Sequence, residues 1–445
     1  MEKRIFEKTD GIRGKAGEEP LTPEAIRRLG GAIGRYFGQG KIVIGRDTRG
    51  SGEWIRSELI LGLASTDIEI IDIGIATSPV TAIMTKLIEG AMGGVIITAS
   101  HNPASDNGIK MFDQSGNKLT DDQELEIEKI FFDEWQESET PRNKKIEYRD
   151  ITNDYINELS EVVEHVTFSG YKVLIDSGAG GGRLLSEKVM RGFGVNVKEI
   201  GPNPNGTNIN ENCGALHPEN LAQAVIQEEA DMGVALDGDA DRIVLVDDLG
   251  RVWDGDRMLA MLAGELKRNN KLPDNVVVMT EYSNLGAVNY MKNNGIKVDK
   301  VIVGDREVAR KCSEIGAMLG GESSGHIIYL PWLSSSDGIM VAMLVLSIIK
   351  KHGKKLSTLW PEYEMMPQKL WNMIVKEKVP LENITGWKKA ATKWNEYLGD
   401  NGRLFARYSG TEKKLRIMVE STDEKRMTKV GNALAQIIKE EIGDE

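Results

Sequence analysis

The amino-acid sequence predicts an α/β protein in which three tandem α/β domains with mixed sheets precede a smaller C-terminal α+β domain. One observation is a repeated order of strand, helix and strand, the unit from which parallel sheets are built. A second is the length of 445 residues, which exceeds what one hydrophobic core organises. A third is the change after Pro361 to short strands and amphipathic helices. We expect domains over residues 1–152, 153–250, 251–362 and 363–445.

The repeated unit occurs three times along the chain. Because the copies share pattern rather than residues, coincidence among α/β chains is the alternative to a true repeat. A helix should begin at Pro23, since Thr22 can cap it and proline suits the first helical position. The predicted strand pairs are 41–47 with 68–74, 172–176 with 195–201, and 276–279 with 296–304.

Composition limits the classes of function. A hydrophobic content of 40% and a charged content of 28% are typical of a soluble globular protein. The chain shows no apolar signal region and no run near the ~18 residues that a membrane span needs, so we expect no membrane partner. Cys213 and Cys312 lie far apart, which supports neither a disulfide framework nor a thiolate zinc site and favours the cytoplasm. The net charge of −12 argues against nucleic-acid binding, and an anionic ligand would need a local cluster of Arg, Lys or helix amino termini.

The first stretch with chemical character is 93–103. An apolar strand runs into a small-residue turn closed by Asn102-Pro103, and this leaves Ser100 at the carboxyl end of the strand. Open α/β sheets bind ligands at that edge. We expect 107–110 to form a second turn that supplies Lys110 as a cation. A loop serine without chemical role is the alternative.

Arg13 is a weaker candidate near the start of the chain. The segment 9–14 is expected to form a turn that places this arginine between Gly11 and Gly14, which would let the backbone approach a ligand closely. An ordinary surface turn is the alternative.

The second stretch carries three carboxylates after the predicted strand 232–236. Asp237, Asp239 and Asp241 stand at i, i+2 and i+4, and such crowded like charges need a cation or a solvated, splayed arrangement. Oxygen ligands without His or Cys indicate Mg²⁺ or Ca²⁺, and phosphate oxygens commonly complete a magnesium shell. An EF-hand is the rival, but Arg242 stands where that loop requires glycine. A solvated acidic turn is the other alternative.

The third stretch, 320–326, is a glycine-rich loop. Glu322 and Ser324 are suited to bind sugar hydroxyls, and His326 to transfer a proton near neutral pH. A glycine-serine loop without function is the alternative.

The fourth stretch, 407–416, lies between two strand-like segments. Its side chains and exposed amides could cradle a phosphate dianion, whereas a basic surface hairpin is the alternative. The residues expected to hold the phosphate are Arg407, Ser409, Gly410, Thr411 and Arg416.

The four stretches together favour phosphoryl transfer through Ser100. A serine hydrolase fits poorly, because the GxSxG pattern is absent and we expect that the adjacent His101 cannot easily turn its ring onto Ser100.

In this order the stretches resemble the α-D-phosphohexomutases, and the resemblance spans essentially the whole chain. Residues 98–103 look like the phosphoserine loop of that superfamily, 237–242 like its metal loop, 321–326 like its sugar loop and 407–411 like its phosphate loop.

Within the superfamily the chain looks most like the phosphoglucosamine mutase branch. Lys8, Tyr408 and Lys413 depart from the usual residues of that branch, and the phosphate-binding groups remain in place. The segments that carry this closer resemblance are 9–14 with 20–24, 208–214 with 217–220, 283–286 and 303–306.

The resemblance implies four domains around a central cleft. It implies the interconversion of glucosamine 6-phosphate and glucosamine 1-phosphate through a 1,6-bisphosphate, which feeds UDP-N-acetylglucosamine synthesis. Ser100 would be carried as a phosphoserine, and one of its phosphate oxygens would join Asp237, Asp239 and Asp241 around one Mg²⁺ per active site. A hexosamine or hexose 1,6-bisphosphate would be the activator, and a homodimer is possible.

The resemblance also implies roles for the remaining candidates. Lys110 and His326 are candidates for proton transfer, Arg13 for stabilising the transferring group, and His101 is counted with the catalytic residues. Lys110 would need a pKa lowered by burial or by nearby cations to act as a base. A phosphomannomutase/phosphoglucomutase is the nearest alternative, and a non-catalytic sugar-phosphate sensor and a phosphatase are others.

Overall fold

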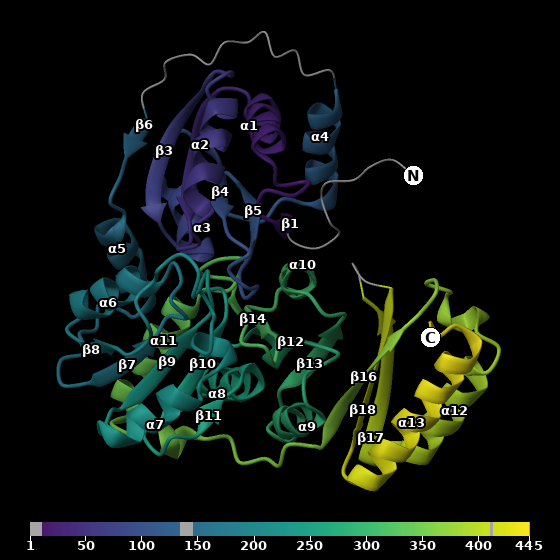
Figure 1. The fold of residues 1–445 in the computed structure, drawn as a ribbon. Helices are drawn as coiled ribbons and strands as arrows, with labels where there is room; N and C mark the ends of the chain where they lie inside the picture. The colour runs from purple at the N-terminus through teal and green to yellow at the C-terminus, as the bar shows by residue number, and fades with distance from the viewer. Residues whose placement is uncertain (1–10, 134–145, 410–412, 445) are drawn as a thin grey trace.

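The computed structural model describes residues 11–133, 146–409 and 413–444 and confirms an α/β fold with a smaller C-terminal domain (Figure 1). The described residues form four sheets, and we call the parts built around them the first, second, third and C-terminal domains. Parallel and antiparallel pairs are mixed in the first three sheets, whereas the C-terminal sheet is antiparallel. No described helix has both the length and the apolar character to span a bilayer.

The first domain contains a six-stranded sheet in the order β1-β5-β4-β2-β3-β6. Strands β2 and β3 are parallel, as the sequence predicts. Thr22 caps α1 through its side chain and Pro23 is the first helical residue, also as predicted. The strands are β1 (Ile12–Lys15), β2 (Gly40–Arg46), β3 (Ile68–Ile75), β4 (Ala91–Ile97), β5 (Asp106–Asp113) and β6 (Ile146–Tyr148), and the helices are α1 (Pro23–Phe37), α2 (Gly52–Leu63), α3 (Ser78–Leu87) and α4 (Asp121–Phe132).

The second and third domains repeat the predicted parallel pair. Strand β7 is parallel to β8, and β12 is parallel to β13. The sheet orders are β11-β10-β9-β7-β8 and β13-β12-β14-β15. The second domain has β7 (Lys172–Asp176), β8 (Asn196–Glu199), β9 (Met232–Leu236), β10 (Ile243–Asp247), β11 (Val252–Trp253), α5 (Thr152–Val162), α6 (Arg183–Gly192) and α7 (Glu219–Gln227), and the third has β12 (Val276–Thr280), β13 (Lys297–Val301), β14 (Leu319–Gly321), β15 (Ile327–Tyr329), α8 (Gly255–Arg268), α9 (Leu285–Asn293), α10 (Asp305–Ile315) and α11 (Gly338–His352).

The C-terminal domain is a three-stranded sheet with two helices on one face (Figure 1). The opposite face contacts the third domain, where Phe405 packs edge-on against Tyr282 and the Arg403 guanidinium lies 3.4 Å from Glu281. Its elements are β16 (Gln368–Ile374), β17 (Gly402–Tyr408), β18 (Lys414–Ser421), α12 (Trp387–Leu398) and α13 (Glu424–Glu441), and short 3₁₀ turns lie at Gly214–Leu216, Pro273–Asn275, Leu356–Leu359, Leu381–Asn383 and Gly399–Asn401.

All four stretches with chemical character connect the two strands of an antiparallel hairpin. The Ser100 loop joins β4 to β5, and the aspartate loop joins β9 to β10. The glycine-rich loop joins β14 to β15, and the predicted phosphate loop joins β17 to β18. The three α/β domains therefore place their loops at equivalent positions, where a strand of the parallel set turns back into an antiparallel neighbour.

Two predicted turns are wrong. Residues 107–110 lie inside β5, and Ile12–Lys15 forms β1, which pairs with β5 in antiparallel register. The glycines that suggested turns instead allow the close approach of neighbouring backbone, since a Cβ on Gly108 would lie 2.5 Å from the Ile12 carbonyl oxygen. The rest of the first predicted turn, residues 9 and 10, lies outside the described residues.

One hydrophobic core runs through the first three domains. It contains Phe112 from the first, Leu236 from the second and Met279 from the third. Helix α11 lies within it, and its first six residues, from Gly338 to Met343, are all buried. Asp337 caps this helix and also accepts a hydrogen bond from the Tyr155 hydroxyl of α5 at 2.7 Å. The three domains are therefore packed together as one body.

Helices α1 and α2 pack so closely that Gly62 cannot carry a side chain. A Cβ there would lie 2.0 Å from the Arg27 carbonyl oxygen, which is backbone and cannot move aside cheaply. We expect Gly62→Ala to destabilise the protein by about 1–3 kcal/mol, visible as a lower melting temperature in circular dichroism. Gly264→Ala in α8 is the matched control. Its Cβ would meet only the Arg268 side chain at 3.6 Å, and it should leave stability unchanged or raise it by up to ~1 kcal/mol. Equal melting temperatures for Gly62→Ala and the native protein would contradict the close packing.

Candidate active site

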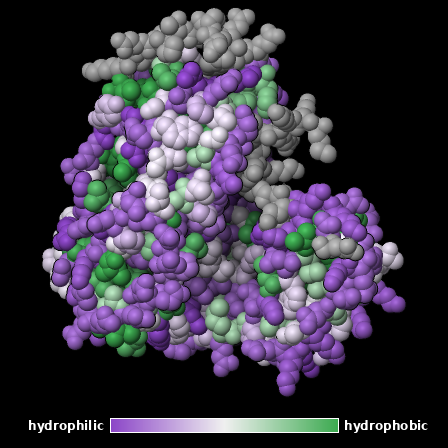
Figure 2. Space-filling view, in the orientation of Figure 1, coloured by the Kyte–Doolittle hydropathy of each residue, from purple (hydrophilic) through white to green (hydrophobic). Residues whose placement is uncertain are grey.

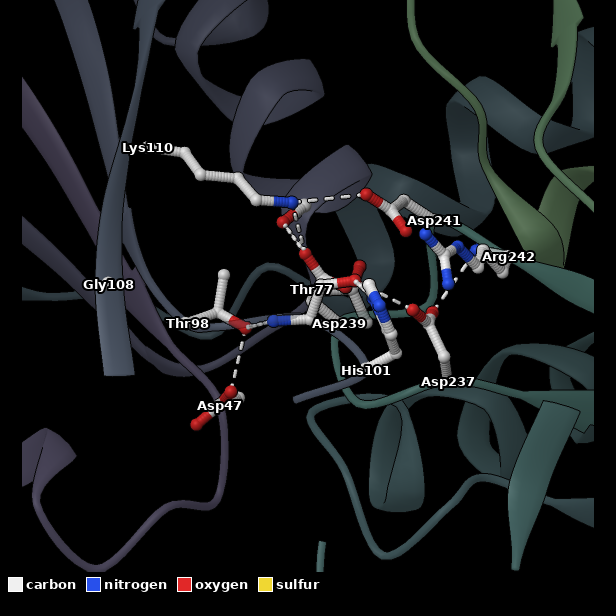
Figure 3. Close-up of polar contacts among 12 residues, drawn as sticks. Asp47, Thr77, Thr98, His101, Gly108, Lys110, Asp237, Asp239, Asp241 and Arg242 are labelled. Atoms are coloured by element: carbon white, nitrogen blue, oxygen red, sulfur yellow. Dashed lines mark hydrogen bonds and ion pairs between the residues drawn. The ribbon is translucent and has the colours of Figure 1, made fainter. Parts of the chain in front are cut away.

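Ser100 lies buried in the loop between β4 and β5, next to the aspartate loop of the second domain. Its hydroxyl donates a hydrogen bond to Asp237 Oδ2 at 2.8 Å. Its backbone N–H donates to Thr98 Oγ1 at 2.9 Å, and its φ of +51° is in the left-handed region that serine rarely adopts. In the view of Figure 3, His101 of this loop lies between Thr98 and Asp237. The structure thus brings together the first two predicted stretches.

Asp237, Asp239 and Asp241 form a buried cluster of carboxylates. Each offers an oxygen, and these three oxygens lie within 4.8 Å of one another. Asp239 Oδ1 and Asp241 Oδ1 are buried without a hydrogen-bond partner among the described residues. Buried carboxylate oxygens without partners are costly, so they fit an oxygen-binding cation. The cluster is therefore a candidate metal site.

Lys110 and Arg242 supply the positive charge around this cluster (Figure 3). The Lys110 ammonium lies 2.7 Å from Asp239 Oδ2 and 3.1 Å from Asp241 Oδ2. The backbone N–H of Arg242 donates to Asp237 Oδ1 at 3.1 Å, and the charge of its guanidinium also acts on Asp237. Burial and the charges of the other two aspartates raise the pKa of Asp237 well above its ordinary value. Burial would also raise the pKa of Asp241, but Lys110 and other nearby cations hold it well below its ordinary value.

His326 uses both ring nitrogens in contacts with the aspartate loop. Nδ1 lies 2.9 Å from the Asp241 carbonyl oxygen, and Nε2 accepts a hydrogen bond from Arg242 Nε at 2.9 Å. This pattern assigns a neutral ring with the proton on Nδ1. In this arrangement His326 orients Arg242.

The His101 ring lies close to the Ser100 hydroxyl. Its Nδ1 lies 3.4 Å from the Ser100 hydroxyl, so the prediction that the ring cannot easily turn onto Ser100 is wrong. The left-handed backbone at Ser100 explains this, because it brings two consecutive side chains to the same side of the chain. Burial, together with the charges of Arg242 and Arg13, lowers the pKa of His101 to about 3. The ring is therefore neutral at physiological pH.

Arg13 projects from β1, where it is paired in register with Gly108 of β5. A Cβ on Gly108 would lie 3.2 Å from its side chain, and its charge acts on His101. It therefore belongs to the Ser100 side of the site.

The glycine-rich loop of the third domain adjoins the aspartate loop. The Ile243 N–H, just beyond that loop, donates to the Gly325 carbonyl at 3.1 Å. Glu322 is buried and accepts hydrogen bonds from the Gly304 N–H at 2.9 Å and the Ser324 hydroxyl at 3.1 Å. The carboxylate and the hydroxyl are thus fixed together in one orientation.

The predicted phosphate loop lies on the C-terminal domain. Arg407 and Arg416 are directly opposite each other on β17 and β18, an arrangement of like charges that favours an anion between them. Ser409 is buried at the end of β17, and Gly410 and Thr411 lie outside the described residues. Figure 2 shows the surface hollowed between this domain and the first domain.

Sequence analysis missed several residues that hold the Ser100 loop or the aspartate loop. Arg49 and Asn210 donate to the Ser100 carbonyl, both at 2.9 Å. The Ser78 hydroxyl donates to Asp239 Oδ2. The sequence did contain a signal for Arg49. This arginine follows β2, and Ser100 follows the parallel neighbouring strand β4, so both residues lie at the same edge of the sheet.

Comparison with known proteins is consistent across the whole chain. Family models described as phosphoglucomutase/phosphomannomutase match all four parts, namely domain I at residues 4–138, domain II at 153–250, domain III at 254–365 and the C-terminal domain at 370–437. A phosphoglucosamine mutase of Citrifermentans bemidjiense is 40% identical over 100% of this chain and 99% of its own length. A phosphoglucosamine mutase of Staphylococcus epidermidis is 37% identical over 98% of both chains.

Solved structures share the fold. A phosphoglucomutase/phosphomannomutase family protein of Burkholderia thailandensis superimposes with a TM-score of 0.78 at 23% identity, over 98% of this chain and 97% of that one. An Aspergillus fumigatus N-acetylphosphoglucosamine mutase, solved in complex with GlcNAc-6P and magnesium, gives a TM-score of 0.67 at 18% identity, over 98% and 96%. The chain therefore belongs to the phosphoglucomutase/phosphomannomutase family, within which the full-length relatives named above are phosphoglucosamine mutases.

Proposed function

We propose that the protein is a phosphoglucosamine mutase, an isomerase that interconverts glucosamine 6-phosphate and glucosamine 1-phosphate through a phosphoserine at position 100. The observation that carries this proposal is the 2.8 Å hydrogen bond from the Ser100 hydroxyl to the buried aspartate cluster. The names of the full-length relatives support the amino-sugar substrate.

The first half of the reaction transfers the phosphoryl group from Ser100 to the substrate. The free sugar hydroxyl attacks the phosphorus, the bond from phosphorus to Ser100 Oγ breaks, and a 1,6-bisphosphate results. Lys110, in its neutral amine form, would accept the proton of the attacking hydroxyl and become the ammonium that pairs with Asp239 and Asp241. It would then pass a proton to the departing Ser100 oxygen. Arg13 would stabilise charge on the transferring group. His101, which is neutral, would donate or accept a hydrogen bond at Ser100 Oγ.

Asp237, Asp239 and Asp241 fit one Mg²⁺, since each offers an oxygen within 4.8 Å of the other two. Asp239 Oδ1 and Asp241 Oδ1 also have no hydrogen-bond partner among the described residues. When bound, the ion would offset the negative charge of the transferring phosphoryl group. Magnesium in the complex of the Aspergillus protein supports this choice of metal.

The second half of the reaction needs the bisphosphate in the reverse orientation. Its other phosphate then faces Ser100, and its phosphoryl group returns to the serine while the sugar hydroxyl regains a proton. Either phosphate must fit one anchor, and we assign that role to Arg407, Ser409 and Arg416, with Gly410 and Thr411 of the same loop. Generic phosphate donors suit an anchor that cannot discriminate between C1 and C6. Glu322 and Ser324 would hold the ring hydroxyls.

We further propose a hexosamine or hexose 1,6-bisphosphate as the activator, because it would rephosphorylate a Ser100 that has lost its phosphoryl group. A homodimer and a cytoplasmic location stay predictions.

Ser100→Ala tests the phosphoserine. We expect intact-mass spectrometry to show no phosphorylated form and turnover of glucosamine 6-phosphate to fall by about 10³-fold or more, because the phosphoryl carrier is missing. Ser105→Ala is the control, since this serine of the same loop is exposed and its hydroxyl donates to Asp106, outside the aspartate cluster. A phosphorylated and active Ser100→Ala protein would end the proposed mechanism.

Asp239→Asn tests the metal site. Removing one charged ligand should weaken the affinity for Mg²⁺ at least about tenfold in titration calorimetry, and the Mg²⁺ concentration that supports activity should rise in parallel. Asp122→Asn, an exposed carboxylate at the start of α4, should behave as the native protein. Unchanged Mg²⁺ affinity of Asp239→Asn would move the metal elsewhere.

A rate comparison tests the substrate. We expect kcat/KM for glucosamine 6-phosphate to exceed the values for glucose 6-phosphate and mannose 6-phosphate at least about tenfold, because the amino group at C2 distinguishes them. A preference for either hexose phosphate would favour a phosphomannomutase/phosphoglucomutase, and net release of inorganic phosphate would indicate a phosphatase. No turnover of any of the three by the native protein would favour a sensor.

A further inference from the structure

Arg49 is a fully buried arginine beneath the Ser100 loop. Its side chain is 0% exposed, and it contacts the loop through backbone carbonyls rather than side chains. Nη2 donates to the Ser100 carbonyl at 2.9 Å and to the Asn102 carbonyl at 2.8 Å. Nη1 donates to the Asp106 carbonyl at 2.9 Å and to the Pro103 carbonyl. One guanidinium thus holds four carbonyls of a single loop.

The fifth N–H of this guanidinium binds Asp47. Nε lies 3.0 Å from Asp47 Oδ2, and the same carboxylate accepts a hydrogen bond from the Thr98 hydroxyl at 2.7 Å. Thr98 Oγ1 in turn accepts the Ser100 N–H at 2.9 Å. Ser100 is therefore held at its carbonyl by Arg49 and at its N–H through Thr98, and both supports are joined at Asp47 (Figure 3 shows the Asp47–Thr98 part).

We propose that Arg49 is a positioning residue for the phosphoryl transfer at Ser100, an inference that rests on the proposed function. A guanidinium has five N–H groups, and all five are used within the protein. Arg49 therefore has no donor left for a substrate phosphate, which excludes the role that an arginine near a phosphoserine would ordinarily suggest. Its function is to fix the backbone that carries the serine.

The backbone of Ser100 needs such support. A φ of +51° is unfavourable for serine, and such a conformation persists only where the surroundings determine it. The loop also turns several carbonyls inward, and each needs a donor. Asn210 of the second domain also donates to the Ser100 carbonyl, at 2.9 Å. Arg49 and Asn210 together set the direction of the serine hydroxyl toward Asp237.

Lysine cannot replace Arg49, because an ammonium is a single point with three donors and cannot reach four separated carbonyls and a carboxylate. A small displacement of a reacting group is enough to slow a reaction about 10²-fold. We therefore expect Arg49→Lys to lower kcat for glucosamine 6-phosphate by about 10²-fold. KM should stay within about threefold of the native value, because the phosphate anchor and the sugar loop are untouched.

Arg56→Lys is the matched control. Arg56 also forms an ion pair with a buried aspartate of the first domain, Asp72. Its other polar contacts among the described residues are with Glu53 and Tyr148, which are not part of the site. It should keep the native kcat and KM. Melting temperatures of both variants, and the fraction of Ser100 phosphorylated by a sugar bisphosphate in intact-mass spectra, separate misplacement of the serine from unfolding.

Two further variants test the same supports. In Arg49→Ala, millimolar guanidinium ion should restore part of the lost kcat without changing KM, whereas methylammonium should not.

Thr98→Val tests the other support if the Arg49 variants do not fold. It removes the acceptor of the Ser100 N–H and should lower kcat without changing KM. A native kcat in Arg49→Lys, or an activity loss fully explained by its unfolded fraction, overturns the inference. Absence of mutase activity in the native protein would instead overturn the proposed function.

Discussion

Repulsion among three buried carboxylates is the constraint on which the active site depends. Two unit charges 4.8 Å apart repel by on the order of 3 kcal/mol at an effective dielectric constant of about 20, and the cluster contains three such pairs. The single positive charge of Lys110 cannot offset the repulsion of all three pairs. Lys110 from the first domain and the charge of Arg242 offset part of this repulsion, so the charges of one loop favour the meeting of elements from two domains.

The loops that carry the site residues all occupy the same position in the fold, the connection of an antiparallel hairpin. Each functional loop joins two antiparallel strands, and in the first three domains the loop follows a strand that is parallel to its other neighbour. Ser100, the aspartates and Glu322 therefore emerge at the same kind of sheet edge. The C-terminal domain supplies Arg407 and Arg416 from a different sheet, which contacts the others mainly through the third domain.

Much of the fold followed from the sequence, because buried strands and helix caps leave local patterns. The three parallel strand pairs and the helix that begins at Pro23 are confirmed. The turn expected at 107–110 is wrong because a glycine that serves close strand packing has the same local signature as a turn glycine. Arg49 was missed because its acceptors are backbone carbonyls, which no side-chain pattern marks. The roles of the site residues stay predictions, since they depend on substrate contacts that neither sequence pattern nor backbone geometry contains. The domain boundaries also stay predictions, because one hydrophobic core runs through the first three domains.

The position of α11 has a consequence for how the protein is made. Gly338, at the start of this helix, donates its N–H to the Ala240 carbonyl in the aspartate loop, and the helix packs against β10 of the second domain. A ribosome releases the second domain about one hundred residues before it releases α11. Until then the part of β10 that α11 covers stays exposed to solvent, and exposed apolar surface of this kind favours aggregation of a nascent chain. The aspartate loop therefore acquires its final surroundings only late in synthesis.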